Sequence, residues 1–469
     1  MSELEQYQRT RTDANGRRSS GHITGSGHIT GSTSREIAAS AEAAIREGLL
    51  ESGDPLPTVR SLASALGASP ATVNSAYRVL RERGLVIAEG RRGTRVAPRP
   101  PLRTPMRPTA VPAADQAGLR DLGIGLPDPG LLPPLPETLA RVDVEQRMLI
   151  SGLEGPDPVL LEVARSGFET DGVAAESIAV ISGALDAIER LLQAHLRPGD
   201  RVVIEDPAYP SIRDILLALG LVAVPVPVDE QGIVPRALEA ALAEGAEAMV
   251  IVPRAQNPLG AALDEDRIGS LRSLLDPFPR LLLIEDDHAG LVSGAPFSTL
   301  ITPDSERWAV IRSMSKILHP DMRLAVVAGD QTTIARVEGR QALGPRWVSH
   351  LLQALAAEML RDPGFQGLCT RAAKAYAHRR HALLDALAGH GIQAYGRSGM
   401  NVWVPVREEA PVVRALLDAG WLVLSGEHFR IRSAPGLRIT IASLEDGEAE
   451  EIARVIAAVE HAGRPRRAY

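Results

Sequence analysis

The spacing of apolar and polar positions changes character along the chain. Between residues 33 and 97, apolar side chains recur every three or four positions in three stretches, and two short apolar runs follow at 85–87 and 94–96. This pattern predicts three helices and a two-stranded hairpin. From about residue 120 to 340, short continuous apolar runs alternate with stretches rich in alanine and leucine. That alternation predicts buried parallel strands separated by helices.

Beyond residue 345, a long helical pattern leads into a smaller segment with strand-like runs at 402–404 and 438–441. The predicted architecture is a small helical module with a hairpin, then a large α/β domain that ends in a small α+β subdomain. The clearest predicted strands of the large domain are the runs 202–204, 249–252, 281–284 and 309–311.

Two segments lack any apolar period. Residues 1–32 contain a perfect tandem hexapeptide, Gly-His-Ile-Thr-Gly-Ser, and are rich in glycine, serine and threonine. We predict a flexible tail there, with no metal site for its paired histidines. Residues 98–112 contain six prolines, which predict a semi-rigid linker. The predicted limits are a tail at 1–32, the module at 33–97, a linker at 98–118 and the large domain at 119–469.

Composition excludes several classes of protein. The net charge of −7 argues against a wholly basic nucleic-acid coat, and 45% hydrophobic residues argue against a chain that is disordered throughout. The single cysteine, Cys369, excludes a disulfide framework and fits a reducing compartment. No apolar run approaches the roughly 20 residues of a membrane span, and the first residues do not form a signal peptide. We therefore expect a cytoplasmic, multidomain protein without a membrane anchor.

The first module has the features of a DNA-binding unit. Three helices and a hairpin describe a winged helix-turn-helix, whose third helix can enter a major groove. Residues 33–99 hold ten arginines and seven acids, a net of +3 in an acidic chain. The segment 56–96 resembles the GntR family of bacterial regulators throughout its length. We predict DNA contacts from the second helix, the third helix and the wing through Arg60, Ser69, Thr72, Asn74, Arg78, Arg91, Arg92 and Arg95.

The chain has only two lysines, Lys316 and Lys374, against 49 arginines. In a chain with so few lysines, we expect a lysine where arginine cannot replace it, for instance where a neutral amine must attack a carbonyl. Lys316 lies in a Ser-x-Ser-Lys sequence with an arginine seven residues later, which resembles the cofactor-lysine motif of fold-type I aminotransferases. The resemblance implies that Lys316 binds pyridoxal 5'-phosphate (PLP) as an aldimine. It also implies phosphate contacts from Ser313, Ser315 and Arg323.

Further motifs of this family follow in the expected order. Gly183, Ala184 and Leu185 open a helix directly after an apolar run, so their amides can hold a phosphate. The Glu-Asp-Pro-Ala-Tyr-Pro loop resembles the family loop whose aromatic ring stacks on the cofactor, which assigns Tyr209. The Asn-Pro-x-Gly sequence assigns Asn257 to the phenolic oxygen of PLP.

Two later motifs complete the implied site. A carboxylate that ends the strand after residue 281 would keep the pyridine nitrogen protonated, and the family spacing selects Asp286 over Asp287, with His288 next to them. On the last predicted strand, Arg438 resembles the arginine that binds the substrate carboxylate. Asn401 is expected to help line that pocket.

Together the two halves resemble the MocR-like subgroup of the GntR family, in which a winged helix-turn-helix is fused to an aminotransferase-like domain. The implied function is a PLP-dependent DNA-binding transcriptional regulator, a homodimer whose large domain senses PLP, an amino acid or an amine. Two alternatives stay open. One is a catalytically active aminotransferase with a DNA-binding module, and the other is a PLP-free scaffold that binds DNA constitutively.

Overall fold

The computed structural model describes residues 28–46, 48–82, 84–88, 93–97, 118–142 and 155–462. The chain separates into two units, Met1–Leu102 and Arg103–Tyr469. Most of the predicted tail, the predicted linker up to residue 117, and the predicted wing residues Arg91 and Arg92 lie outside the described residues.

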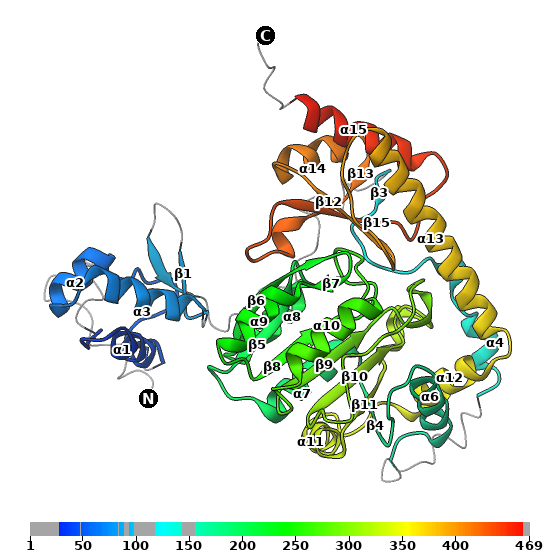
Figure 1. The fold of residues 1–469 in the computed structure, drawn as a ribbon, viewed down its shortest axis with the longest axis horizontal. Helices are drawn as coiled ribbons and strands as arrows, with labels where there is room; N and C mark the ends of the chain where they lie inside the picture. Colours follow the sequence, from blue (N-terminus) through cyan, green and yellow to red (C-terminus); the bar gives the residue numbers. More distant parts are fainter. Residues whose placement is uncertain are drawn as a thin grey trace, which may run out of the picture. The chain divides into compact units, whose positions relative to one another are not determined.

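The first unit is the predicted winged helix-turn-helix. Its elements are α1 (Ser34–Arg46), α2 (Val59–Leu66), α3 (Pro70–Glu82), β1 (Val86–Ala88) and β2 (Thr94–Val96) (Figure 1). Helix α2 begins where the Thr58 hydroxyl accepts a hydrogen bond from the Ser61 amide at 3.1 Å. It ends at Gly67, whose φ of 64° is left-handed and favours glycine. The strands β1 and β2 pair antiparallel as the hairpin.

The boundary of the predicted tail needs a correction. Ile29, in the second copy of the hexapeptide, is 1% exposed and belongs to the core of the winged module. The Thr30 amide donates to the Ser40 hydroxyl at 2.9 Å, and the Ser32 amide donates to the Glu36 carboxylate at 2.9 Å. Residues 28–32 therefore pack on α1. The free energy gained by burying the Ile29 side chain exceeds the cost of ordering the glycine- and serine-rich segment around it.

The second unit is built around an eight-stranded sheet of order β4-β11-β10-β9-β8-β5-β6-β7. The five neighbours from β10 to β6 run parallel, whereas β11 is antiparallel to both its neighbours and β7 is antiparallel to β6. Their bounds are β4 Ser177–Ile181, β5 Arg201–Asp206, β6 Val222–Asp229, β7 Gly232–Ile233, β8 Ala248–Ile251, β9 Leu282–Asp287, β10 Trp308–Ser313 and β11 Ala325–Gly329.

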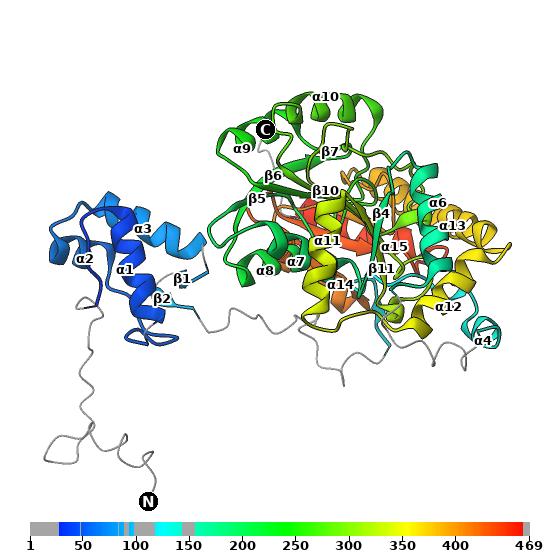
Figure 2. The ribbon, with the colours of Figure 1, turned by 90° about the horizontal axis from the view of Figure 1, so that it is seen from below.

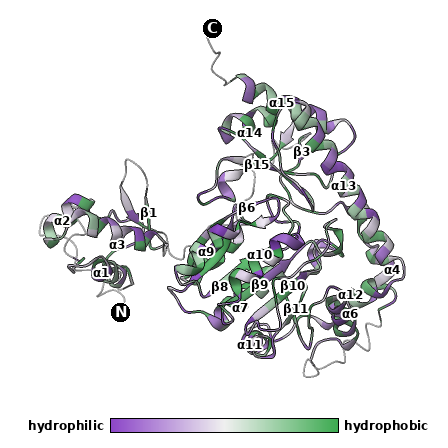
Figure 3. Cartoon of the chain, viewed as in Figure 1, coloured by the Kyte–Doolittle hydropathy of each residue, from purple (hydrophilic) through white to green (hydrophobic). Residues whose placement is uncertain are grey.

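Both faces of this sheet are buried, which explains the continuous apolar runs. Val202 and Ile204 of β5 belong to one hydrophobic core, whereas Val203 belongs to the other, because successive side chains point to opposite faces. Helices α7 (Ala184–His195), α8 (Pro210–Ala218) and α11 (Gln331–Ala342) cover one face (Figure 2). The opposite face is covered by helices that include α6 Pro158–Thr170, α9 Pro235–Ala243, α10 Glu265–Leu275, α12 His350–Arg361 and α13 Phe365–Gly389. Figure 3 shows hydrophobic residues gathered on helix α9 and along the central strands.

The small subdomain has a three-stranded antiparallel sheet, formed by β12 (Asn401–Pro405), β15 (Gly436–Thr440) and β14 (Leu424–Ser425). Strand β13 (Trp421–Leu422) pairs in parallel with β3 (Arg120–Asp121), so the beginning of the second unit joins its carboxyl-terminal part. The remaining elements are the helices α4 Leu135–Leu139, α14 Glu409–Asp418 and α15 Glu448–Ala462 and the one-turn 3-10 helices Pro129–Leu131, Gly290–Val292, Pro320–Met322 and Gly426–His428. None of the described helices has both the length and the apolar surface to cross a bilayer.

Candidate functional site

A cavity of about 670 Å³ opens at the carboxyl ends of β5, β8, β9 and β10. In open α/β sheets this is the edge where ligands bind. The cavity is lined by every predicted cofactor- or substrate-binding residue except Gly183: Ala184, Leu185, Tyr209, Asn257, Asp286, His288, Ser313, Ser315, Lys316, Arg323, Asn401 and Arg438.

Lys316 follows strand β10 and reaches into the cavity, where its amine donates a hydrogen bond to the carbonyl of Gly125. Burial, and then the positive charge of Arg438, lower the pKa of Lys316 to about 8. A lysine with this pKa offers a larger fraction of neutral amine near neutral pH than an exposed lysine does. That is the property required of an amine that attacks an aldehyde.

The two neighbouring carboxylates that end β9 have opposite environments. Asp287 is fully buried and accepts two hydrogen bonds of 2.7 Å from the guanidinium of Arg254. Asp286 faces the cavity, and its buried Oδ1 atom has no hydrogen-bond partner. Burial raises the pKa of Asp286 to about 7, and the charge of Asp287 contributes to the same shift. A protonated pyridine nitrogen would supply the missing donor, so this side of the cavity fits PLP.

His288 is the next residue along the chain and also lines the cavity. Its Nδ1 atom is buried and has no hydrogen-bond partner. Burial, and then the nearby charge of Lys316, lower the pKa of His288 to about 4. The imidazole is therefore neutral near pH 7 and can donate from one nitrogen and accept at the other.

Another group of residues at the cavity suits a phosphate. Gly183 has a φ of 100°, and a Cβ atom there would lie 3.0 Å from Nη2 of Arg323, so glycine allows the guanidinium to approach the start of α7. Ser313 lies at the end of β10, and its hydroxyl accepts from the Ser315 amide at 3.3 Å. A helix amino terminus, two hydroxyls and an arginine form a donor set for a dianion.

Arg438 lies on β15 and is 3% exposed. Its guanidinium donates to the Asn257 side-chain oxygen at 3.3 Å and to the carbonyl of Gly123, and it lies 5.0 Å from the centre of the Phe429 ring. Burial lowers the pKa of Arg438 to about 10, which leaves it charged at neutral pH. The Asn401 side-chain oxygen accepts from Thr440 at 3.0 Å. The structure therefore places Arg438, the predicted hydrogen-bond donor to a substrate carboxylate, next to Asn257, the predicted ligand of the PLP phenolic oxygen.

Sequence reasoning missed the residues that support these side chains. Gln256 donates to the Glu205 carboxylate at 3.1 Å and to the Pro207 carbonyl at 2.8 Å, so it joins the loop of Tyr209 to the loop of Asn257. Burial raises the pKa of Glu205 to about 8. Glu205 belongs to the quoted Glu-Asp-Pro motif, and the available signal was its position at the carboxyl end of a buried strand.

Asp206, the next residue, has a different supporting role. Its carboxylate accepts hydrogen bonds from the amides of residues 431–433 at 2.7 to 3.0 Å and from the Ser433 hydroxyl at 2.9 Å. These bonds fix the loop that places His428 and Phe429 in the cavity wall.

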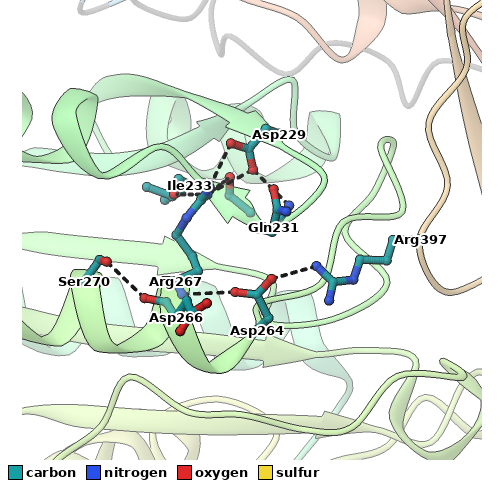
Figure 4. A network of polar contacts seen from close by, with 9 residues as sticks. Asp229, Gln231, Ile233, Asp264, Asp266, Arg267, Ser270 and Arg397 are labelled. Carbon is teal, nitrogen blue, oxygen red and sulfur yellow. Dashed lines mark hydrogen bonds and ion pairs between the residues drawn. The ribbon is translucent and has the colours of Figure 1, made fainter.

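A polar network holds the loop that precedes Asn401 (Figure 4). Arg397, in that loop, donates to the Asp264 carboxylate at 3.0 Å, and Asp264 also caps α10 by accepting from the Arg267 amide at 3.0 Å. The Arg267 guanidinium in turn forms two bonds of 2.8 and 2.9 Å to Asp229 at the end of β6. The network joins the loop before the small subdomain's first strand to the large sheet at the carboxyl end of β6.

The predicted DNA-binding face is partly engaged within the winged module itself. Ser69 caps α3, because its hydroxyl accepts from the Thr72 amide at 3.1 Å and lies 2.9 Å from the Thr72 hydroxyl. Arg95 is half-buried and donates to the Gly53 carbonyl at 2.8 Å, so it also secures the hairpin. Three further predicted contacts are exposed to solvent: Arg60, Asn74 and Arg78.

Comparisons with known proteins agree with both units. The family described as bacterial regulatory proteins of the gntR family matches residues 33–96, and the family of class I and II aminotransferases matches residues 167–456. The chain is 41% identical to the vitamin B6 salvage pathway transcriptional repressor PtsJ of Salmonella typhimurium, over 90% of this chain and 97% of that relative. The chain belongs to the MocR-like group of GntR regulators.

Other relatives of this MocR-like protein agree with the assignment. It is 29% identical to the pyridoxine biosynthesis transcriptional regulator PdxR of Corynebacterium glutamicum, over 73% of this chain and 76% of that relative. Kynurenine aminotransferase of Pyrococcus horikoshii has the same fold as the large unit, with a TM-score of 0.68 at 22% identity over 74% of this chain and 92% of that one. The predictions of fold class, family and PLP as cofactor are confirmed.

Proposed function

We propose that this MocR-like regulator controls its own DNA binding according to whether PLP, alone or with an amino compound, is bound in the large unit. The observation that supports this most strongly is the cavity, where Lys316, Asp286, Arg323 and Arg438 meet in a chain that also has a winged helix-turn-helix. Relatives named for vitamin B6 salvage and pyridoxine biosynthesis favour PLP itself as one signal.

Different residues of the cavity would bind different parts of PLP. PLP supplies an aldehyde and an electron-withdrawing pyridine ring when it is bound. Lys316 would hold the aldehyde end, since its lowered pKa provides neutral amine, and Asp286 would accept a hydrogen bond from the pyridine nitrogen. Arg323 and the first turn of α7 would hold the phosphate.

Arg438 indicates the class of the second ligand. A planar guanidinium with several donors matches a carboxylate, and Arg438 lies in the same cavity as the Lys316 amine. An α-amino acid has both a carboxylate and an amine that can react with bound PLP. We therefore propose amino acids, ahead of simple amines, as the amino compounds that this site accepts.

We further propose a cytoplasmic homodimer. Fold-type I sites normally form where two subunits meet, and the apolar side chains of Ile124, Leu126 and Tyr209 at the cavity are 40 to 48% exposed in the single chain. A twofold dimer would present two winged modules to a repeated DNA site. The proline-rich segment 98–112 would then set how far the two modules can reach.

The test is a DNA-binding titration against the upstream region of the protein's own gene at fixed salt. It compares PLP-free protein, PLP-loaded protein and a Lys316→Ala variant. We expect PLP to change the DNA affinity of the unaltered protein and to have little effect on the variant. DNA affinity that ignores PLP, together with steady turnover of an amino acid and a keto acid, would instead favour the catalytically active aminotransferase.

A further inference from the structure

The two loops that carry Tyr209 and Asn257 lie next to each other. One loop follows β5 and the other follows β8, and these strands are parallel neighbours in the sheet. Parallel strands end at the same edge of a sheet, and residues of both loops line the cavity there. We expect Tyr209 to stack on the PLP ring and Asn257 to donate to its phenolic oxygen. The relative position of the two loops therefore decides whether both can contact one PLP molecule.

A buried side-chain amide connects the two loops. It belongs to Gln256, which is 0% exposed and lies in the loop after β8. Its Nε2 atom donates to the Pro207 carbonyl at 2.8 Å and to the Glu205 carboxylate at 3.1 Å, and its Oε1 atom accepts from the Leu259 amide at 2.9 Å. A side-chain amide has two N–H donors and one oxygen. Both donors therefore hold the end of β5 and the loop after it, while the oxygen holds a turn in the loop after β8.

Gln256 lies behind the cavity wall. Its neighbours Ala255 and Asn257 are among the described residues that line the cavity, whereas Gln256 is not. A ligand in the cavity would therefore contact Asn257 and not Gln256. Any effect of Gln256 on PLP has to pass through the residues that its amide holds in place.

Each loop also has an anchor of its own. In the loop after β5, the Ala208 amide donates to the Phe429 carbonyl at 2.9 Å. In the loop after β8, the Ala255 amide donates to the Ser398 hydroxyl at 2.8 Å. These anchors tie each loop to a different segment further along the chain, so we expect both loops to stay folded without the Gln256 amide. Its loss would remove the connection that it provides from one loop to the other.

The surroundings of the amide restrict it to one orientation. Pro207 is buried and Glu205 is 3% exposed, so the oxygens that accept from Gln256 lie inside the protein. A buried polar atom costs free energy unless it is hydrogen-bonded. An apolar side chain of similar size would fill the same space and leave both acceptors without this donor. The amide therefore sets the spacing of the two loops as well as filling the space between them.

We propose that Gln256 is a positioning residue for PLP, whose amide holds Tyr209 and Asn257 at the spacing at which both contact the cofactor. This inference deepens the proposed function and rests on its PLP-binding part. The ring of PLP is rigid and planar, so it cannot follow two loops that move apart. A shift between the loops would weaken one of the two contacts and change the surroundings of the ring.

The test replaces the amide in the full-length protein and measures PLP binding without DNA. Gln256→Met removes both donors at similar size, and Gln256→Glu keeps the oxygen that accepts from Leu259 but, as a carboxylate, has no proton to donate. Absorbance titration gives the Kd for PLP, and circular dichroism in the visible band of saturating PLP reports the surroundings of the ring. We expect each variant to raise the Kd about tenfold or more and to reduce the circular dichroism per bound PLP by about half or more.

Gln353→Met is the matched control. Gln353 is 1% exposed, donates to the Val348 carbonyl at 2.8 Å and accepts from the Asp157 amide at 2.8 Å. These three described residues are not among those that line the cavity. Since both substitutions break buried hydrogen bonds, we expect Gln353→Met to lower the melting temperature about as much as Gln256→Met. It should leave the Kd and the circular dichroism of bound PLP unchanged.

Several results would overturn the proposal. One is an unchanged Kd in the Gln256 variants. Another is a raised Kd with unchanged circular dichroism, because the surroundings of the ring would then be intact. A third is a loss of PLP binding as large in Gln353→Met as in Gln256→Met, which would indicate a general effect of stability. If Gln256→Met does not fold, Gln256→Glu is compared with the control in the same way.

The outcomes separate this inference from the proposed function. The titrations contain no DNA, so DNA affinity that ignores PLP would refute the proposed regulation and leave the role of Gln256 to the PLP measurements. Gln256 variants that bind PLP like the unaltered protein would refute the positioning role and leave the regulation standing. An unaltered protein that binds no PLP would refute both.

Discussion

At the scale of single residues, consecutive acidic residues at the carboxyl ends of β9 and β5 have different roles. On β9, Asp286 faces the cavity with an unpartnered oxygen, whereas Asp287 is paired with Arg254 on the other face. On β5, Glu205 supports the loops around the cofactor position and Asp206 fixes the loop of the small subdomain. Strand alternation is the cause, since it sends consecutive carboxylates to different surroundings.

The pair on β9 gives the first prediction. Asp286→Asn should weaken PLP binding at least tenfold and change the free energy of unfolding by less than about 1 kcal/mol, because its Oδ1 atom has no partner to lose. Asp287→Asn should lower stability by about 3 kcal/mol, because it leaves the buried charge of Arg254 poorly compensated. PLP titration and thermal unfolding of both variants check this. Equal stability losses would contradict the assigned roles.

The second prediction concerns pH. Since burial and Arg438 lower the pKa of Lys316 to about 8, the neutral amine increases about tenfold per pH unit below that value and levels off above it. The rate of PLP association should follow the same course, measured by stopped-flow absorbance between pH 6 and pH 9.5. Arg438→Gln removes a nearby positive charge and should shift the midpoint to higher pH. An unshifted midpoint would mean that burial alone sets the pKa.

At the scale of elements, the local pattern predicted most of the helices and strands. The runs 202–204, 249–252, 281–284 and 309–311 fall on β5, β8, β9 and β10 of the parallel part of the sheet, where both faces are buried. The exception lies at the start of the winged module. There the composition of the hexapeptide predicts a flexible segment, and a single isoleucine fixes its second copy on α1.

This exception gives the third prediction. Ile29→Ala should destabilise the winged module by about 2 to 4 kcal/mol, because it removes a side chain that is 1% exposed from a small core. The matched control is Ile23→Ala, which changes the same residue in the first copy of the hexapeptide. Thermal unfolding of both variants is the measurement. A loss that is as large for Ile23→Ala would contradict the assignment of the buried position to Ile29.

At the scale of the whole molecule, one chain combines a DNA-binding unit with a ligand-binding unit, joined through residues 98–117. Regulation requires that occupancy of the cavity changes the free energy of DNA binding. Thermodynamic linkage makes this coupling reciprocal.

Reciprocity is the fourth prediction. If saturating PLP changes the affinity for operator DNA by a given factor, saturating operator DNA must change the affinity for PLP by the same factor, within about twofold experimental error. Fluorescence anisotropy of labelled DNA and absorbance titration of PLP measure the two sides at one salt concentration. Non-cognate DNA of equal length is the control. A PLP affinity that is insensitive to operator DNA would exclude allosteric coupling between the two units.

The sequence by itself determined the features that depend on local order. Periodicity determined the helices and strands, and short motifs identified the winged module, Lys316 and the residues around it, because these signals lie within a few positions of one another. Tertiary structure decided which of them meet. The contact of Gly125 with Lys316 spans 191 positions and that of Gly123 with Arg438 spans 315, and both depend on β3 pairing beside the small subdomain. A backbone carbonyl has no side-chain signature, so only the folded chain shows which carbonyls contact Lys316 and Arg438.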